Sequence, residues 1–276
     1  MIRQLAWRNI WRNKTRSMAV ILALAAGLSG ALFMSAMANG IAQRSVMASI
    51  DRETADIQIH QAQYLIMEDL NMTFDGAELD ALLNTHSEIR NHSYRLKTPA
   101  MASTATNALQ VNLIGVEPLS EQQVSTIHSL LEAGAYFENA SLLQEIVFST
   151  RLAEKLKVRM GSKIILSFAN VEGEIAYENY KVGGLFKTNN AVFDEAHVFV
   201  KREGLRKLLA LEPGMFHEAA IRLNEGAVVE RAAEDLNEQL NGLRAETWKE
   251  LNPTMAVASS TMEIFKYILV MIVLIA

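Results

Sequence analysis

The sequence contains no cysteine, which excludes disulfide bonds, thiol chemistry and cysteine-ligated metal sites. It also lacks a G-x-x-x-x-G-K-[S/T] loop and an H-E-x-x-H motif, so it has neither that phosphate-binding loop nor that zinc site. Its six histidines are scattered, and none lies three or four residues from another. The neighbouring acids Asp194 and Glu195 could contact a metal, but such a pair is more typical of a solvated turn. We therefore expect no catalytic residue, no cofactor and no metal, and we do not interpret the chain as an enzyme.

Acidic residues are absent before Asp51, and charge of either sign is absent from residues 17–43. The apolar segment Ser17–Ala38 has 22 residues. About 20 are needed to cross a bilayer, whereas a signal peptide has an apolar region of about 7–15. We therefore predict a transmembrane helix over residues 17–39. The triplet Ala36-Met37-Ala38 resembles a cleavage site, so a signal peptide remains the alternative.

The stretch WRNIWRNK repeats the triplet Trp-Arg-Asn at a spacing of four residues, directly before the apolar segment. On a helix this spacing places the two tryptophans on one face, one turn apart. Aromatic rings with unopposed cations are typical of a helix lying at headgroup depth in a membrane interface, so we predict a cytoplasmic interfacial amphipathic helix over residues 1–16. Five cations before residue 17 put the N-terminus in the cytoplasm and the chain after about residue 40 outside. The predicted site residues are the interfacial anchors Trp7, Arg8, Trp11 and Arg12, and the helix-contact glycines Gly27 and Gly30.

The C-terminal end is also apolar. Lys266 is the last charged residue, and Tyr267–Ala276 carries none. Ten helical residues rise about 15 Å, which is half of the hydrocarbon thickness, and a chain ending there leaves carbonyl groups unpaired in lipid. We therefore interpret residues 263–276 as the truncated start of a second transmembrane helix, and the chain as a fragment of a longer permease-like protein. A short interfacial tail is the alternative.

The segment between the two membrane regions is an acidic domain of about 220 residues. The net charge is −5 and the first 16 residues carry five positive charges, so the remainder carries −10, which argues against a nucleic-acid partner. Short strands and helices alternate without βαβ regularity, which predicts an α+β fold. The expected strands are 54–61, 90–97, 101–106, 109–115, 145–148, 163–168, 177–186, 196–200 and 218–223, and the expected helices are 75–84, 120–132, 150–157, 203–211 and 226–240.

A series of motifs follows this organisation in order along the chain. They are AWRNIWRNKTRS at 6–17, NLIGVEP at 112–118, GAYFE at 134–138, EIVFSTRLAEKLKVRMGSKIIL at 145–166, YKVGGLFKTNNAVFDEAHVFV at 180–200 and WKELNP at 248–253. In their order and spacing they resemble the MacB-like and lipoprotein-releasing (LolC/LolE) permeases of ABC transporters, a family that includes FtsX relatives. The turn positions Ser149-Thr150, Gly161-Ser162 and Thr188-Asn189 depart from the family pattern, which affects the subfamily more than the fold.

The resemblance implies an inner-membrane, multi-pass subunit with four membrane helices, a cytoplasmic N-terminus and a periplasmic domain at 40–262. It implies a membrane-proximal part at 44–98 and 218–255, and an inserted part at 99–217. The implied partners are a separate cytoplasmic ABC ATPase, a second permease copy or paralogue, membrane lipids and a periplasmic acceptor or adaptor. The implied function is to transmit ATP-driven motion and move lipoproteins or other amphiphilic substrates. The alternatives are an FtsX-like signalling subunit that activates a periplasmic partner, and a membrane-anchored binding protein without an ATPase.

Overall fold

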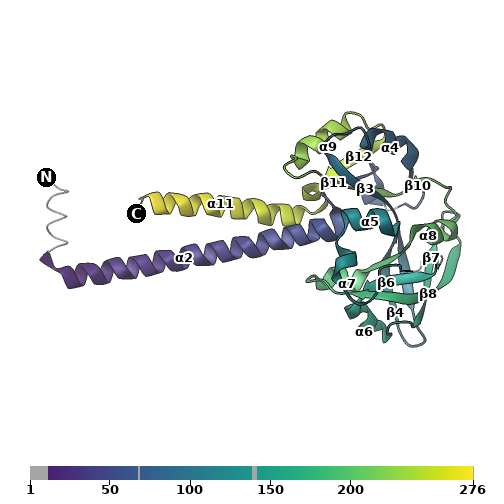
Figure 1. Cartoon of the computed structure of the whole chain (residues 1–276), viewed down its shortest axis with the longest axis horizontal. Helices are drawn as coiled ribbons and strands as arrows, with labels where there is room; N and C mark the ends of the chain where they lie inside the picture. The colour runs from purple at the N-terminus through teal and green to yellow at the C-terminus, as the bar shows by residue number, and fades with distance from the viewer. Residues whose placement is uncertain (1–11, 68, 139–141, 276) are drawn as a thin grey trace. The chain divides into compact units, whose positions relative to one another are not determined.

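The computed structural model describes residues 12–67, 69–138 and 142–275 (Figure 1). The chain divides into two compact units. One comprises Met1–Ala48 with Asn252–Ala276, and the other comprises Ser49–Leu251. The first unit is helical where it is described, and the second is a mixed α/β domain. A mixed α/β composition with an apolar N-terminal helix agrees with the sequence-based fold prediction.

The helices and strands have the following bounds. The helices are α2 Lys14–Ser49, η1 Ile50–Thr54, α3 Tyr64–Met67, α4 Gly76–Leu83, α5 Pro118–Val124, η2 Ile127–Leu130, α6 Thr150–Leu156, α7 Ala191–Ala196, α8 Arg202–Leu208, α9 Val229–Asn237, α10 Trp248–Leu251 and α11 Pro253–Ile275. The strands are β1 Ile57–Gln61, β2 Phe74–Asp75, β3 Ile89–Ser103, β4 Ala108–Val116, β5 Leu131–Gly134, β6 Glu145–Ser149, β7 Lys163–Ala169, β8 Ile175–Phe186, β9 His197–Lys201, β10 Met215–Phe216, β11 Glu218–Leu223 and β12 Leu243–Thr247.

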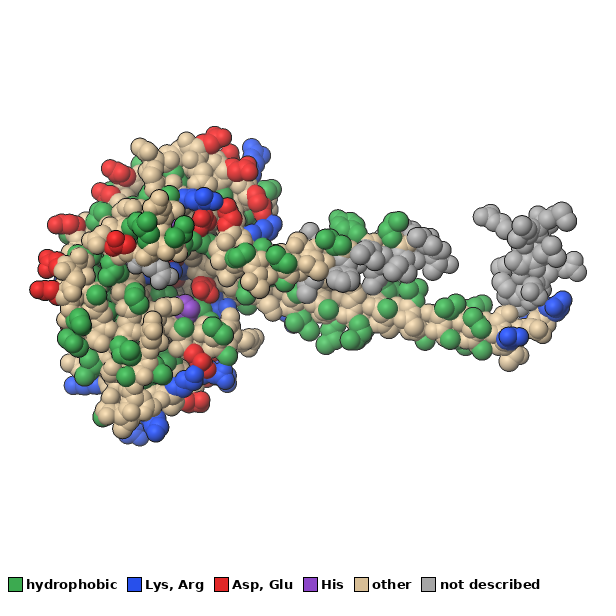
Figure 2. Space-filling view, turned by 180° about the vertical axis from the view of Figure 1, so that it is seen from behind, with side chains coloured by type: hydrophobic (Ala, Val, Ile, Leu, Met, Phe, Trp, Pro, Cys, Tyr) green, Lys and Arg blue, Asp and Glu red, His purple; other side chains and the backbone are tan. Residues whose placement is uncertain are grey.

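The N-terminal helix runs without interruption from Lys14 to Thr54, and among the described residues it alone is long and apolar enough to cross a membrane. Its uncharged stretch presents apolar side chains to the surroundings on all sides, as in a membrane span. Figure 2 shows hydrophobic side chains along the described helical segments and acidic side chains on the α/β domain. The helix therefore continues beyond residue 39, where the predicted transmembrane helix ends. The C-terminal helix α11 begins at Pro253, a residue suited to the first helical position.

Ten strands form one sheet, and six of them close into a ring. β3 pairs with β4, then the order continues through β9, β6 and β8, and β7 returns from β8 to β3. On the other side of β3, the order is β11, β1 and β12. β3 is therefore shared by the ring and by the four-stranded part beside it.

β3 passes through Pro99, where the sequence had suggested two separate strands. The N–H of Lys97 donates to Nδ1 of His217, on the side of β3 away from β4. Residues two apart in a strand direct their N–H groups to the same side, so the nitrogen of Pro99 also faces away from β4. On that side β11 pairs only as far as Arg95, and β7 begins to pair at Met101. Because no strand of the described residues lies against Pro99 there, its missing N–H costs no ladder hydrogen bond.

The two main hydrophobic cores meet at Arg95 of β3. The first is built from α4, α9 and the strands β1, β11 and β12, and it includes Tyr94. The second fills the ring and is covered by α6 and α8, and it includes Leu96. Figure 1 shows α4 and α9 over one part of the domain, and α6, α7 and α8 around the other. Arg95 therefore stands in β3 at the boundary between the two cores.

The helix expected over residues 120–132 is wrong in both bounds and length. α5 begins at Pro118, which occupies its first turn, and ends at Val124. A short 3₁₀ turn and strand β5 follow. The helix ends because Ser125 and Thr126 turn their donors toward carbonyl groups of Asp51 and Arg52, as described below. A tertiary contact thus replaces the next helical turn.

Candidate functional site

The last turn of the N-terminal helix, η1, is π-helical and belongs to the α/β domain. The N–H of Ala55 donates to the carbonyl of Ile50 at 2.9 Å, a bond across five residues. Ala55 has φ 54° and ψ −161°, a backbone region that is almost confined to glycine and costs roughly 1–3 kcal/mol in other residues. Single π-helical turns of this kind are rare and frequently lie at functional sites.

Donors from the domain satisfy the carbonyl groups that end this helix. The carbonyl of Asp51 accepts from both the N–H (2.7 Å) and the Oγ1 hydroxyl (3.1 Å) of Thr126. The carbonyl of Arg52 accepts from the hydroxyl of Ser125 at 3.1 Å. The last four carbonyls of a helix have no partner within the helix, so these bonds form a cap supplied by a distant segment.

Arg95 supplies the next bond of this cap and is the centre of a buried ion-pair network. Its Nη1 donates to the carbonyl of Glu53 at 2.7 Å and to Oε1 of Glu218 at 2.8 Å. Its Nε and Nη2 donate to the two carboxylate oxygens of Glu121 at 3.0 and 2.6 Å. Lys97 donates to the other oxygen of Glu218 at 3.0 Å. One side chain of β3 therefore joins η1, α5 and β11.

The charges of this network are buried and balanced by each other. Arg95, Glu121 and Glu218 are 4%, 1% and 0% exposed. Burial lowers the pKa of Arg95, but Glu121 and Glu218 outweigh that effect and raise it above its ordinary value. Burial raises the pKa of Glu218, but Lys97 and Arg95 together lower it to about 2. Arg95 and Glu218 are therefore charged at neutral pH, and removal of either one leaves a buried charge with fewer partners.

Arg222 of β11 holds the same helix end from a second strand. Its Nη2 lies 3.0 Å from Oδ1 of Asp51 and donates to the carbonyl of Val124 at 3.0 Å. Its Nη1 lies 3.5 Å from Oδ1 of Asp56. Positive side chains are favourable at a helix C-terminus, where the helix dipole is negative. We refer to η1 together with Arg95, Glu121, Glu218 and Arg222 as the junction.

Arg52 also lies within η1, and its side chain contacts Phe193 of α7. Its side chain is 5% exposed, and its Cζ lies 4.6 Å from the ring centroid of Phe193. Among the described residues its guanidinium makes no hydrogen bond or ion pair, and its Nε is buried without a partner. Burial lowers the pKa of Arg52, and the nearby Glu53 and Asp194 offset only part of this effect. Arg52 is thus a buried cation that lies on an aromatic face, with Glu53 and Asp194 nearby.

The structure places the sequence-predicted site residues as follows. Trp7, Arg8 and Trp11 lie outside the described residues, and Arg12 is exposed. Gly27 and Gly30 have open space around them in the described part of the chain. The interfacial anchors and the glycine contact stay predictions.

The solvated turn expected at Asp194 is wrong. Asp194 is 3% exposed and accepts hydrogen bonds from the N–H and the Oγ1 hydroxyl of Thr188 at 3.1 and 2.6 Å. These bonds fix the loop before α7, which carries Phe193 beneath Arg52. Its neighbour Glu195 lies at the surface and pairs with Lys155 at 2.7 Å. Within residues 12–67, 69–138 and 142–275, no three His, Asp or Glu side chains are arranged to hold a metal.

Sequence reasoning missed the junction itself. Arg95 and Arg222 stand inside segments that were correctly expected to be strands, at 90–97 and 218–223. For Arg222 the local signal was a charged side chain in a mostly apolar strand, whereas residues 90–97 are largely polar and gave no such signal for Arg95. The identity of its partner was not visible, because Glu121 and Glu218 lie 26 and 123 positions from Arg95.

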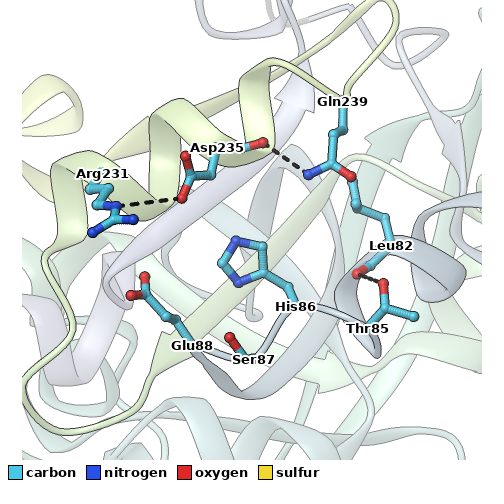
Figure 3. A pocket seen from close by; sticks show the side chains of 8 residues that line it. All are labelled: Leu82, Thr85, His86, Ser87, Glu88, Arg231, Asp235 and Gln239. Carbon is cyan, nitrogen blue, oxygen red and sulfur yellow. Dashed lines mark hydrogen bonds and ion pairs between the residues drawn. The ribbon is translucent and has the colours of Figure 1, made fainter.

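A separate polar pocket of about 320 Å³ lies between the end of α4 and α9 (Figure 3). Nδ1 of His86 and Oε2 of Glu88 are buried there without a protein partner within the described residues. Ordered water commonly satisfies such atoms, whereas sites for small organic ligands are mostly apolar. We assign no ligand to this pocket, which is lined by Leu82, Thr85, His86, Ser87, Glu88, Arg231, Asp235 and Gln239.

Comparison with known proteins supports the resemblance found in the sequence. Residues 17–239 match the family described as the MacB-like periplasmic core domain. A search of curated proteins found no significant match. The periplasmic region of MacB from Actinobacillus actinomycetemcomitans superposes with a TM-score of 0.51 at 10% identity, covering 77% of this chain and 98% of that one. The extracellular domain of the noncanonic ABC-type transporter YknZ from Gram-positive bacteria gives a TM-score of 0.49 at 14% identity, covering 69% and 99%. At these identities the MacB superposition supports the fold alone.

Proposed function

The chain belongs to the MacB-like periplasmic core domain family, and we propose that it is the permease subunit of an ABC transporter that transmits ATP-driven motion to its periplasmic domain. The observation that carries this proposal is the junction. A single helix from Lys14 to Thr54 ends in carbonyl groups that are bound by α5 and β3. The helix is continuous from Lys14 to the last turn that makes these contacts, so we propose that a displacement of this turn acts on α5 and β3.

The proposal includes a topology and a domain division. The N-terminus lies in the cytoplasm, the α/β domain lies in the periplasm, and a second transmembrane helix begins near residue 263. The membrane-proximal part comprises 44–98 and 218–255, and the inserted part comprises 99–217. The two separate cores support this division, since the buried members of one lie within 57–94 and 219–245 and those of the other within 96–211.

The proposed partners follow from the family. ATP hydrolysis is placed on a separate cytoplasmic ABC ATPase, since the sequence contains no phosphate-binding loop of that type. A second permease copy or paralogue completes the membrane part, and a periplasmic acceptor or adaptor receives the substrate. The proposed substrates are lipoproteins or other amphiphilic molecules of the inner membrane or periplasm. Activation of a periplasmic partner without transport, as in FtsX-like subunits, is the alternative.

The test uses the full-length permease expressed in its own host with Arg222→Gln. The matched control is Arg244→Gln in β12, because Arg244 is half exposed and forms its ion pairs at the surface. Three quantities are measured: the ATPase subunit recovered with the permease, ATP hydrolysis by the complex, and the fraction of acylated protein retained in the inner membrane.

We expect both variants to recover an ATPase, and only Arg222→Gln to retain acylated protein in the inner membrane. Absence of a co-purifying ATPase contradicts the transporter assignment. An intact ATPase complex that changes the activity of a cell-wall hydrolase but not acylated protein release favours the signalling alternative.

A further inference from the structure

The hydrogen bonds of η1 compete with those of a regular α-helix. In an α-helical turn the N–H of Ala55 donates to the carbonyl four residues earlier, which is that of Asp51. This carbonyl already accepts two hydrogen bonds from Thr126. A carbonyl oxygen has two lone pairs, so Ala55 cannot bond to it unless Thr126 gives up at least one bond. The π-helical bond to Ile50 and the Thr126 cap therefore belong to the same state.

Two further features make this state costly. Ala55 holds a positive φ that is strained for alanine but not for glycine, and it is 1% exposed in contact with Val124 and Ala220. The guanidinium of Arg52 is held against Phe193 with no hydrogen bond or ion pair in the described part of the chain. Strain of this kind persists only where the surrounding structure imposes it, and it is characteristic of switch regions.

We propose that η1 is a two-state latch. In the latched state, which is the one described, the turn is π-helical, Thr126 binds the carbonyl of Asp51, and Arg52 lies on Phe193. In the released state the turn is α-helical, the N–H of Ala55 replaces the N–H of Thr126 on the carbonyl of Asp51, and Arg52 leaves Phe193. The strain at Ala55 and the burial of Arg52 oppose the latched state, and the caps from Thr126, Ser125 and Arg95 favour it. The inference rests on the proposed function in one respect, namely that transmembrane motion selects between the states.

The released state has a specific signature in the backbone amides. Release exposes the N–H of Thr126 to water, whereas the N–H of Ala55 exchanges one carbonyl partner for another and stays protected. Simple fraying of the helix end exposes both amides. Hydrogen–deuterium exchange of the full-length protein in lipid nanodiscs, followed by mass spectrometry on peptides covering residues 50–57 and 123–128, separates these cases.

Substitutions that remove the cost of the latched state should slow exchange at Thr126. Arg52→Met keeps an apolar stem on Phe193 but buries no charge, and Ala55→Gly removes the positive-φ strain. Each should slow Thr126 exchange about tenfold, within the range expected for one relieved backbone or burial cost. The matched control is Arg44→Met, the same change on the exposed surface of the preceding helix, which should leave the rate unchanged.

The outcomes separate the latch from the proposed function. The latch is overturned if the amides of Ala55 and Thr126 exchange together, or if Thr126 exchanges faster in both Arg52→Met and Ala55→Gly. Neither result affects ATPase co-purification, which remains the evidence for the transporter. In wild-type complex, trapping the ATPase with ATP and vanadate should raise Thr126 exchange alone. If the variants behave as expected but nucleotide trapping has no effect, the latch stands and its control by the ATPase is wrong.

Discussion

Arg95 and Glu121 form a bidentate ion pair, with N–O distances of 2.6 and 3.0 Å, at the point where β3 passes from one hydrophobic core to the other. Both side chains are at least 95% buried. The pair joins α5 to β3, and the same guanidinium reaches the carbonyl of Glu53 at the helix end. Because the guanidinium is planar and forked, it serves three elements at once, which a lysine at this position would not do.

The first prediction concerns the stability of this pair. Arg95→Met leaves the carboxylates of Glu121 and Glu218 buried with fewer partners, and we expect it to lower the free energy of unfolding by about 3–5 kcal/mol. Denaturant unfolding of the detergent-solubilised protein, followed by circular dichroism, measures the change. Lys249→Met is the control, because the Lys249–Glu230 pair is half exposed and its loss should cost at most about 1 kcal/mol. Equal losses in the two variants would show that the buried network contributes no more than a surface pair.

The second prediction concerns acid stability. Glu218 has a pKa of about 2 in the folded protein against about 4.5 when unfolded, since Lys97 and Arg95 outweigh the effect of burial. The unfolded chain therefore binds the proton more tightly, and the stability contributed by Glu218 is complete above pH 4.5 and lost as the pH falls toward 2. The loss should reach about 3 kcal/mol. Glu218→Gln should be less stable at neutral pH and should lose less stability between pH 4.5 and 2. An unchanged pH slope in this window contradicts the prediction.

The third prediction concerns His217 at milder pH. Its Nδ1 accepts from the N–H of Lys97 and its Nε2 donates to the carbonyl of Leu70, both at 3.0 Å, so the folded protein holds the neutral ring. Burial lowers the pKa of His217 below its ordinary 6.5. Stability should therefore be complete above pH 6.5 and decline as the pH falls below it. The decline should be smaller in His217→Gln, measured by thermal unfolding between pH 7.5 and 5.5. This window lies above that of Glu218, so the two effects are separable.

The fourth prediction concerns topology. A reporter fused near Asn170, in the turn between β7 and β8, should be exported, and one fused to the N-terminus should stay in the cytoplasm. The mature full-length protein should retain residues 1–38, as determined by N-terminal sequencing. A mature N-terminus at Asn39 would instead establish a cleaved signal peptide.

The fifth prediction concerns the repeated tryptophans. Residues 1–276 contain three tryptophans, so a protein in which Trp248 and any tryptophan outside these residues are replaced by Phe reports Trp7 and Trp11 alone. Their emission should be blue-shifted, quenched by shallow lipid-borne quenchers and poorly quenched by iodide, because interfacial rings lie at headgroup depth. Replacing both with alanine should weaken interfacial attachment by a few kcal/mol while leaving membrane insertion intact. Free quenching by iodide in the intact complex would rule out the anchoring helix.

The sequence predicted those elements whose pattern is local. The apolar run predicted the N-terminal helix, and strands were predicted at 163–168, 177–186 and 218–223, which the structure confirms within a few residues. The helix at 150–157 was placed correctly, and its apolar residues Leu152, Ala153 and Leu156 are all buried. The ordered motifs indicated the family, which the match over residues 17–239 confirms.

Other parts of the structure depend on which segments meet in space. The ring closes because β7 pairs with both β8 and β3, and no local pattern specifies the second partner. The short strands at 131–134 and 243–247 were not predicted. The helix expected at 120–132 ends at Val124, because Ser125 and Thr126 bond to the carbonyl groups of Arg52 and Asp51, which lie 73 and 75 residues earlier in the chain.

The sequence by itself determined that this protein has an apolar helix leading into an acidic α+β domain, because hydrophobic length and periodicity are properties of neighbouring residues. Only the tertiary structure decided where the helix end is held. In the sequence, Arg95 and Arg222 cannot be distinguished from any other charged residue in a strand. Their role is identified by their bonds to backbone carbonyls and to acidic side chains, which lie as far as 171 positions away (Arg222 to Asp51). A buried charge is tolerated only where its partners converge, and this convergence exists only once β3, β11, α5 and η1 have come together.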